Sequence, residues 1–175
     1  RNLKEKFPEI KYVIIGDGDE KKRLLSLVKE LKLEKEVVFL DNIEQKLKIS
    51  LLRTSNLFLM PSIIYKKSVE GFGISFIEAA SYGVGSIGGK DGGASDAIKN
   101  NETGLICDGQ DIGSIYNSIT EFLTDATTKF PHLIGIKWVK LSFPDWFASI
   151  RQFNKTHALL FAPEPKIASF SLGPG

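Results

Sequence analysis

The sequence predicts a doubly wound α/β domain built around a parallel sheet. Short apolar segments alternate with longer segments in which apolar residues recur at helical spacing, and this alternation continues to about residue 124. The apolar segments are continuous, which is typical of strands buried on both faces of a sheet. Ligands of such sheets bind beyond the carboxyl ends of the strands. The candidate functional segments are therefore the turns at residues 16–18, 40–43, 62–73 and 88–93.

Each predicted strand is a short apolar run that ends at a turn residue. The first run, YVII, stops at Gly16, and the run LFLM stops at Pro61; both residues interrupt regular structure. The pair Ser86 and Ile87 predicts only a weak strand, because it lies in a glycine-rich stretch. The predicted strands are residues 12–15, 37–40, 57–60, 86–87 and 104–107.

The predicted helices are amphipathic segments between these strands. The first follows Asp19 and Glu20, whose charges suit the positive end of a helix dipole. The last carries Ile112, Ile115 and Ile119 on one side, at the spacing of a helix face packed on a core. The predicted helices are residues 24–31, 44–53, 74–82 and 111–123, and residues 3–7 resemble the end of a further helix.

The character of the sequence changes after residue 125, where most of the prolines and both tryptophans lie. Pro144 can open a helix in which Trp146, Ile150 and Phe153 share one side. An exposed apolar side of this kind predicts self-association of the chain. The predicted parts are residues 1–125, the α/β domain; residues 126–161, a helical C-terminal extension; and residues 162–175, a disordered tail rich in Pro, Ser and Gly.

The composition excludes several classes of protein. The 175 residues are 42% hydrophobic and 25% charged, as in globular domains and unlike disordered or coiled-coil chains. No apolar run approaches the roughly 18 residues needed to cross a bilayer. A net charge of +2 does not favour nucleic acid as a partner. The single cysteine, Cys107, excludes an internal disulfide. Because the chain begins at Arg1, near the end of a predicted helix, we expect it to be a fragment of a longer protein.

The segment EGFGISFIE, residues 70–78, carries the most chemical information. Gly71 and Gly73 permit a sharp loop and close approach of the backbone to a ligand. This loop leads into a helix that starts at about Ile74, and the free N–H groups of a helix N-terminus favour a phosphate. The carboxylates of Glu70 and Glu78 can border the same cleft, where they suit sugar hydroxyls. Without its context such a pair of glutamates is most simply a solvated helix face.

In its context the segment resembles a known family. Residues 8–125 look like the second, donor-binding domain of the retaining glycosyltransferases of the GT-B fold, of the group 1 or family 4 type. The resemblance rests on the Gly16-Asp17-Gly18 turn, the Glu-x7-Glu motif, the pair Gly92-Gly93 and the Thr103-Gly104-Leu105 turn, in this order. It implies a Rossmann-like domain that lacks its first strand here, because the matching strand would precede Arg1.

The resemblance also implies roles for individual residues. Glu78 matches the glutamate that holds the ribose hydroxyls of the nucleotide, and Glu70 matches the catalytic-site glutamate beside the donor sugar. The implied donor-binding residues are Gly16 and Gly18 of the glycine turn; Leu40, Asn42 and Ile43 where the base docks; Gly71, Phe72, Gly73, Ile74 and Ser75 at the diphosphate and sugar; and Gly92 and Gly93. The family usually has no essential metal, so the resemblance implies no cofactor and no metal, with the nucleotide-diphosphate sugar as substrate.

The implied reaction moves a sugar from a nucleotide-diphosphate sugar to an acceptor hydroxyl with retention. The acceptor is a glycan, a lipid or a small molecule, and nucleic acid is not a partner. The resemblance further implies an N-terminal domain that this sequence lacks, so we expect the isolated fragment to be inactive. Members of the family commonly work in the cytoplasm, often at the inner face of the plasma membrane, and we expect the same location here.

Two departures from the family pattern bear on the site. The family has Pro-Val-Ile where this sequence has Gly85-Ser86-Ile87, which loosens the entry to that strand. The arginine and lysine that grip the diphosphate in the family have no counterpart here, since their positions would precede Arg1.

Three other interpretations remain open. The first is a non-catalytic module that binds a nucleotide with the same fold. The second is a related enzyme, either a sugar-nucleotide epimerase or a glycogen-type synthase. The third is an unrelated doubly wound domain such as a receiver, which would need an acidic cluster at the strand ends, where only Asp17 and Asp41 lie.

Several residues with reactive or charged side chains are better explained by structure than by function. Cys107, in an apolar run, is expected to be a small buried hydrophobe. Lys21, Lys22 and Arg23 are expected to form a solvated helix face. His132 and His157 have no partner at metal-ligand spacing and are expected to be surface or packing residues; no metal site is predicted.

Overall fold

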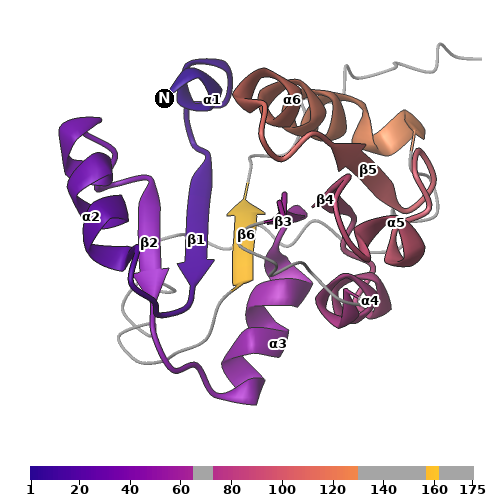
Figure 1. The fold of residues 1–175 in the computed structure, drawn as a ribbon, viewed down its shortest axis with the longest axis horizontal. Coiled ribbons are helices and arrows are strands. Elements are labelled where there is room, and N and C mark those ends of the chain that lie inside the picture. The colour runs from indigo at the N-terminus through magenta and orange to yellow at the C-terminus, as the bar shows by residue number, and fades with distance from the viewer. Residues whose placement is uncertain (65–72, 130–156, 162–175) are drawn as a thin grey trace, which may run out of the picture.

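A computed structural model describes residues 1–64, 73–129 and 157–161 (Figure 1). Residues 70–72 of the Glu-x7-Glu segment, the predicted apolar face at 146–153 and the predicted tail at 162–175 lie outside the described residues. The helices are α1 (Asn2–Lys6), α2 (Lys21–Glu30), α3 (Gln45–Thr54), α4 (Ile74–Ser81), α5 (Ala94–Ala97) and α6 (Ile112–Lys129). The strands are β1 (Lys11–Ile15), β2 (Val37–Leu40), β3 (Leu57–Met60), β4 (Ser86–Gly89), β5 (Gly104–Cys107) and β6 (His157–Phe161).

These strands form one sheet in the order β2-β1-β6-β3-β4-β5. The pairs β1–β2, β3–β4 and β4–β5 are parallel, which confirms the predicted α/β fold. Strand β6 lies between β1 and β3 and runs antiparallel to both, as its reversed arrow in Figure 1 shows. In the doubly wound order 3-2-1-4-5-6 this central place belongs to the first strand of the domain. The structure fills it with β6, the last of the described strands along the chain.

The predicted helical extension is therefore wrong at residues 157–161, which form β6. The sequence HALLF is a continuous apolar run, and such a run fits a buried strand as well as one side of a helix. Pairing on both sides decides between the two, because it gives β6 backbone partners in β1 and in β3.

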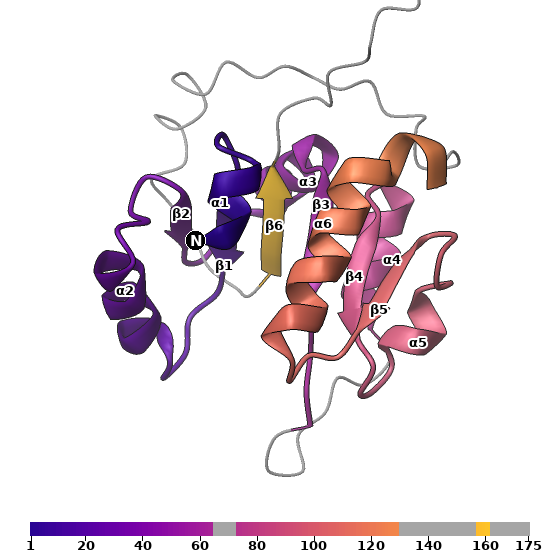
Figure 2. The same ribbon diagram turned by 90° about the horizontal axis from the view of Figure 1, so that it is seen from above.

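Helices cover both faces of the sheet, and each face has its own apolar core. Figure 2 shows the same elements from above. One core joins the sheet to α3, α4 and α5, and its Phe58 and Phe76 rings meet edge to face with centroids 5.5 Å apart. The other joins the sheet to α1 and α6 and includes Cys107, which is buried as predicted. Burial raises the pKa of the Cys107 thiol.

Two elements differ from the sequence-based prediction in their extent. The segment expected to be a weak strand is β4, of which all four residues are buried. Gly88 and Gly89 explain this: a Cβ on Gly89 would lie 2.0 Å from the Ser62 carbonyl oxygen, so glycine lets the end of β3 pack directly on β4. Helix α6 continues to Lys129, beyond the predicted end at 123. In the described part of the chain, none of the helices has the length and hydropathy of a membrane span.

One ion pair ties the N-terminal helix to the sheet. The Lys4 Nζ atom of α1 lies 2.8 Å from Glu36 Oε1, just before β2, and the Glu36 side chain is only 12% exposed. The hydrogen bond from Lys4 holds the pKa of the Glu36 carboxyl below its usual value. A depressed carboxyl pKa contributes stability that is present above the unfolded pKa and is lost as the pH falls through the folded pKa.

We expect Lys4→Met to lower the free energy of unfolding by about 1 kcal/mol at pH 7, an amount limited by the solvent exposure of Lys4. Because Glu36 must be ionised for the pair to act, the difference from the parent should shrink as the pH falls below about 4 and vanish below the folded pKa of Glu36. Urea denaturation at a series of pH values measures this, with the exposed Lys46→Met as the control. A difference that persists unchanged at pH 3 would contradict the ion-pair explanation.

Candidate functional site

The turns that follow the parallel strands lie at the carboxyl edge of the sheet. Gly16, directly after β1, has a φ of 152°, a conformation that other residues rarely adopt. Its N–H donates to the Leu40 carbonyl at 2.9 Å, which joins the ends of β1 and β2. Gly18 has open space where a Cβ would be. An open hollow of about 410 Å³ lies here, lined by Asp17, Gly18, Asp19, Lys21 and Lys22.

Lys21 is the central charge of this hollow. Its Nζ atom lies 3.8 Å from Asp17 and forms a short ion pair with Asp41, from the turn after β2. The Lys21 side chain is 22% exposed, so the prediction of a solvated face is wrong for Lys21, whereas Lys22 and Arg23 are exposed. The ion pair with Asp41 could not be predicted, because its partners come from turns twenty residues apart.

In the predicted base-docking turn, Leu40 and Ile43 pack against the core, and the side chains of Asp41 and Asn42 are accessible. The Leu40 side chain is 5% exposed and belongs to the core, and Ile43 packs against the same core. Asn42 is exposed and has a φ of 48°, in the left-handed region that asparagine tolerates. A ligand at this turn would therefore meet Asp41 and Asn42, while Leu40 and Ile43 hold the turn in place.

The start of α4 has the geometry that the EGFGISFIE segment predicts. Gly73 is the N-cap and adopts the left-handed conformation, with φ 72° and ψ 40°. A Cβ there would lie 2.7 Å from the Phe76 ring, so this position favours glycine for two reasons. Ile74 is 71% exposed, and Ser75 is half-buried. The first turn of α4 thus lies at the edge of the sheet where ligands bind in doubly wound folds, with Ile74 exposed and Phe76 packed in the core.

Glu78 lies one turn further along α4 and is not free. Lys48 of α3 contacts both of its oxygens, at 2.7 Å for Oε1 and 2.8 Å for Oε2. The two side chains are 19% and 23% exposed. Lys48 is a residue that sequence reasoning missed: it stands thirty residues before Glu78 on a different helix, and no local pattern joins the two.

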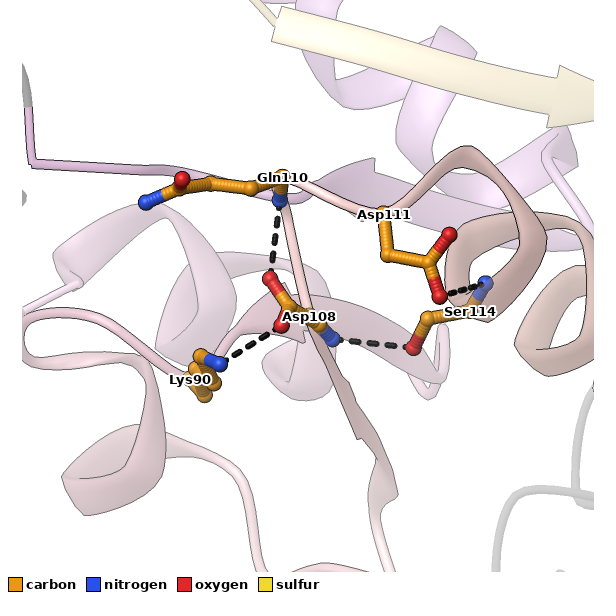
Figure 3. Close-up of polar contacts among 5 residues, drawn as sticks. All are labelled: Lys90, Asp108, Gln110, Asp111 and Ser114. Atoms are coloured by element: carbon orange, nitrogen blue, oxygen red, sulfur yellow. Dashed lines mark hydrogen bonds and ion pairs between the residues drawn. The ribbon is translucent and has the colours of Figure 1, made fainter.

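The glycine-rich segment after β4 is held by a polar cluster (Figure 3). Lys90 donates to Asp108 Oδ2 at 2.6 Å, which links the turn after β4 to the turn after β5. This hydrogen bond raises the pKa of Lys90 and lowers that of Asp108. The Asp108 N–H donates to Ser114 Oγ, and Asp111 accepts from the Ser114 N–H, at the start of α6. The cluster was not predicted, because its members come from two separate loops.

Gly92 and Gly93 follow Lys90 at the same edge. Gly92 is exposed with a φ of 84°, and Gly93 is buried as the N-cap of α5. The carboxyl edge therefore brings together the predicted site residues of four turns: Gly16 and Gly18 after β1, Leu40 to Ile43 after β2, Gly73 to Ser75 after β3, and Gly92 and Gly93 after β4. Glu70, Gly71 and Phe72 lie outside the described residues.

The chain matches one family of known proteins over most of its length. Residues 1–135 match the family described as "Glycosyl transferases group 1". A solved structure, the sucrose-phosphate synthase of Thermosynechococcus elongatus, superposes with a TM-score of 0.57 at 28% identity. The match covers 67% of this chain and 29% of that one.

Curated relatives come from several bacteria. The N-acetyl-alpha-D-glucosaminyl L-malate synthase of Bacillus anthracis is 33% identical over 120 residues, which are 67% of this chain and 29% of the relative. The GDP-mannose-dependent alpha-(1-6)-phosphatidylinositol monomannoside mannosyltransferase of Mycolicibacterium smegmatis is 28% identical over 125 residues, 70% of this chain and 33% of the relative. The chain thus spans a third or less of the length of these relatives.

Proposed function

Because this chain belongs to the group 1 glycosyl transferase family, we propose that it is the donor-binding part of a glycosyltransferase. Its substrate is a nucleotide-diphosphate sugar, and the sugar passes to an acceptor hydroxyl with retention at the anomeric carbon. The relatives named above transfer different sugars to different acceptors, as their names state. We therefore propose only the class of donor, a nucleotide-diphosphate sugar. Experiments must identify its base and its sugar.

The observation that carries this proposal is the start of α4. Gly73 turns the chain so that the N-terminus of an eight-residue helix opens at the carboxyl edge of the sheet. Backbone N–H groups and the helix dipole at this end stabilise a phosphate group. Glu78 follows on the same helix, in reach of a ligand that lies along it, and a carboxylate is a good acceptor for a pair of ribose hydroxyls.

We assign the chemistry to the following steps. The bond between the anomeric carbon and the diphosphate oxygen breaks, and its electrons leave with the diphosphate, which the α4 N-terminus stabilises. The acceptor oxygen bonds to the same face of the anomeric carbon, and its proton passes to the leaving diphosphate. Glu70 is proposed to lie beside the donor sugar, where a carboxylate stabilises positive charge on the sugar ring. No metal is needed for these steps.

Titration calorimetry of the chain with UDP, GDP and ADP, each with and without Mg²⁺, tests the proposal. We expect one of the three to bind with a Kd in the micromolar to millimolar range, in line with about 4 to 8 kcal/mol of binding free energy for a single domain. Binding should not depend on Mg²⁺, because the α4 N-terminus is the proposed site that stabilises the diphosphate. Failure of all three nucleotides to bind would refute a working donor site in this chain.

A second candidate is a module that binds the nucleotide without transferring the sugar. The described residues that carry the proposal, the start of α4 and Glu78, bear on nucleotide binding and not on the transfer step. Adding an N-terminal domain from a relative in trans separates the two candidates. Sugar transfer to an acceptor supports the enzyme, whereas nucleotide binding without transfer supports the module.

A further inference from the structure

The contact between Lys48 and Glu78 joins two helices that cover the same face of the sheet. Lys48 lies on the first half of α3, and Glu78 lies on α4. Both helices contribute to the core that contains Leu51, Phe76 and Ala79, so their backbones are held by packing. The ammonium group sits between the two carboxylate oxygens, at 2.7 Å and 2.8 Å. Since the backbones are fixed, this contact determines where the Glu78 carboxylate points.

The contact leaves room for a ligand. An ionised carboxylate has about four acceptor positions, two on each oxygen. One ammonium group that meets both oxygens uses one position on each. The Glu78 side chain is 23% exposed, so the remaining positions can accept hydroxyl groups from solvent or from a ligand. The pair thus forms an acceptor that is already oriented before any ligand binds.

The positive charge of Lys48 also offsets the repulsion between the Glu78 carboxylate and the phosphates of the proposed ligand. A nucleoside diphosphate carries two or three negative charges, and the first turn of α4 is the proposed place for its phosphates. An unpaired carboxylate one turn away would repel these charges, and partial burial would weaken the screening by water. With Lys48 in contact, the pair is neutral overall, so Glu78 can accept ribose hydroxyls without this repulsion.

We propose that Lys48 is a positioning residue for the nucleotide donor: it orients and neutralises Glu78 so that Glu78 recognises the ribose diol. This proposal rests on the proposed function. Without Lys48, the Glu78 side chain would regain rotamers, and the loss of this freedom on binding would oppose the binding of the ligand. The effect should concern the ribose hydroxyls, because these are the groups that Glu78 is proposed to contact.

The test compares each ribonucleoside diphosphate with its 2′-deoxy analogue, in the parent chain and in Lys48→Met. In the parent, we expect the ribonucleotide to bind about tenfold more tightly, the effect of one hydrogen bond to a charged group. In Lys48→Met we expect this ratio to fall below about threefold. Lys48→Arg keeps the positive charge and should restore most of the ratio. Lys46→Met, an exposed lysine two residues earlier on α3, is the matched control and should leave the ratio unchanged.

The ratio of ribonucleotide to 2′-deoxynucleotide affinity distinguishes a positioning role of Lys48 from a purely structural one. If Lys48 only stabilised the fold, its loss would weaken both nucleotides equally and leave the ratio at the parent value, which would overturn the proposal. In Glu78→Gln the ratio should also collapse, and adding Lys48→Met should change it no further. An additional loss in the double variant would contradict action through Glu78. If the parent chain binds no nucleotide, both the proposed function and this proposal are refuted. If the parent binds and Lys48→Met keeps the parent ratio of ribonucleotide to 2′-deoxynucleotide affinity, only the role of Lys48 is refuted.

Discussion

Replacing Glu78 by glutamine is expected to weaken binding of the preferred nucleoside diphosphate by roughly tenfold to a hundredfold, the loss that follows when hydroxyls no longer donate to a charged acceptor. Glutamine keeps the shape of the side chain and retains a carbonyl oxygen that can accept from Lys48. The fold should therefore persist, and the thermal unfolding midpoint should stay within a few degrees of the parent value. Titration calorimetry of both proteins under identical salt measures the change.

The matched control for this variant is Glu30→Gln. Glu30 is the last residue of α2, is exposed, and lies far along the chain from the proposed ribose contact. It removes the same single charge, so any effect of net charge on nucleotide affinity appears in both variants. Equal affinity of Glu78→Gln and Glu30→Gln would refute the assignment of Glu78 to the nucleotide.

Replacing Gly89 by alanine is expected to lower the free energy of unfolding by about 3 kcal/mol. The substitution adds a methyl group where the neighbouring backbone leaves no space. The added Cβ would lie 2.0 Å from the Ser62 oxygen and 2.8 Å from the Ser62 nitrogen, and both are backbone atoms that cannot rotate away. The ends of β3 and β4 would have to separate. The turn after β3 leads toward α4, so the candidate site should be disturbed as well.

Gly18→Ala is the control for the Gly89 variant. It adds the same methyl group, but no atom lies within 4 Å of the added Cβ. We expect its stability to lie within about 0.5 kcal/mol of the parent, since a surface change without contacts has little effect. Guanidinium denaturation followed by circular dichroism compares the three proteins. Equal midpoints for Gly89→Ala and Gly18→Ala would contradict the close approach of β3 and β4.

Most of the fold could be predicted because its signals are local. Strands β1, β2 and β3 are short apolar runs followed by Gly, Asp or Pro, and α3, α4 and α6 begin within one residue of the predicted start. What could not be predicted depends on contacts between distant segments. The run at 157–161 has no local feature that distinguishes a buried strand from a helix, and only pairing with β1 and β3 decides it. Helix α5, of four residues, is too short to show a helical period.

In the candidate site, too, local features could be predicted from the sequence and contacts between distant residues could not. Gly73 could be singled out from the sequence, because a glycine between a strand and a helix indicates a turn that other residues cannot make. The roles of Lys21 and Lys48 could not, because their partners Asp41 and Glu78 stand twenty and thirty residues away. A lysine on an amphipathic helix has the same local pattern whether it is solvated or paired. Its partner becomes visible only when the helices have been placed.

The central position of β6 has a consequence for how the chain folds. Strands β1 and β2 form one parallel pair, and β3, β4 and β5 form another group. Among the described strands, only β6 pairs with both groups, with Lys11 opposite Phe161 and Leu57 opposite Leu160. The contacts that complete the sheet therefore connect residues that lie far apart in the sequence, and closing such long loops is entropically unfavourable and slow. On the ribosome, the edges of β1 and β3 would stay open until β6 has been synthesised. Slow sheet completion and a need for protection from aggregation during synthesis follow from this topology.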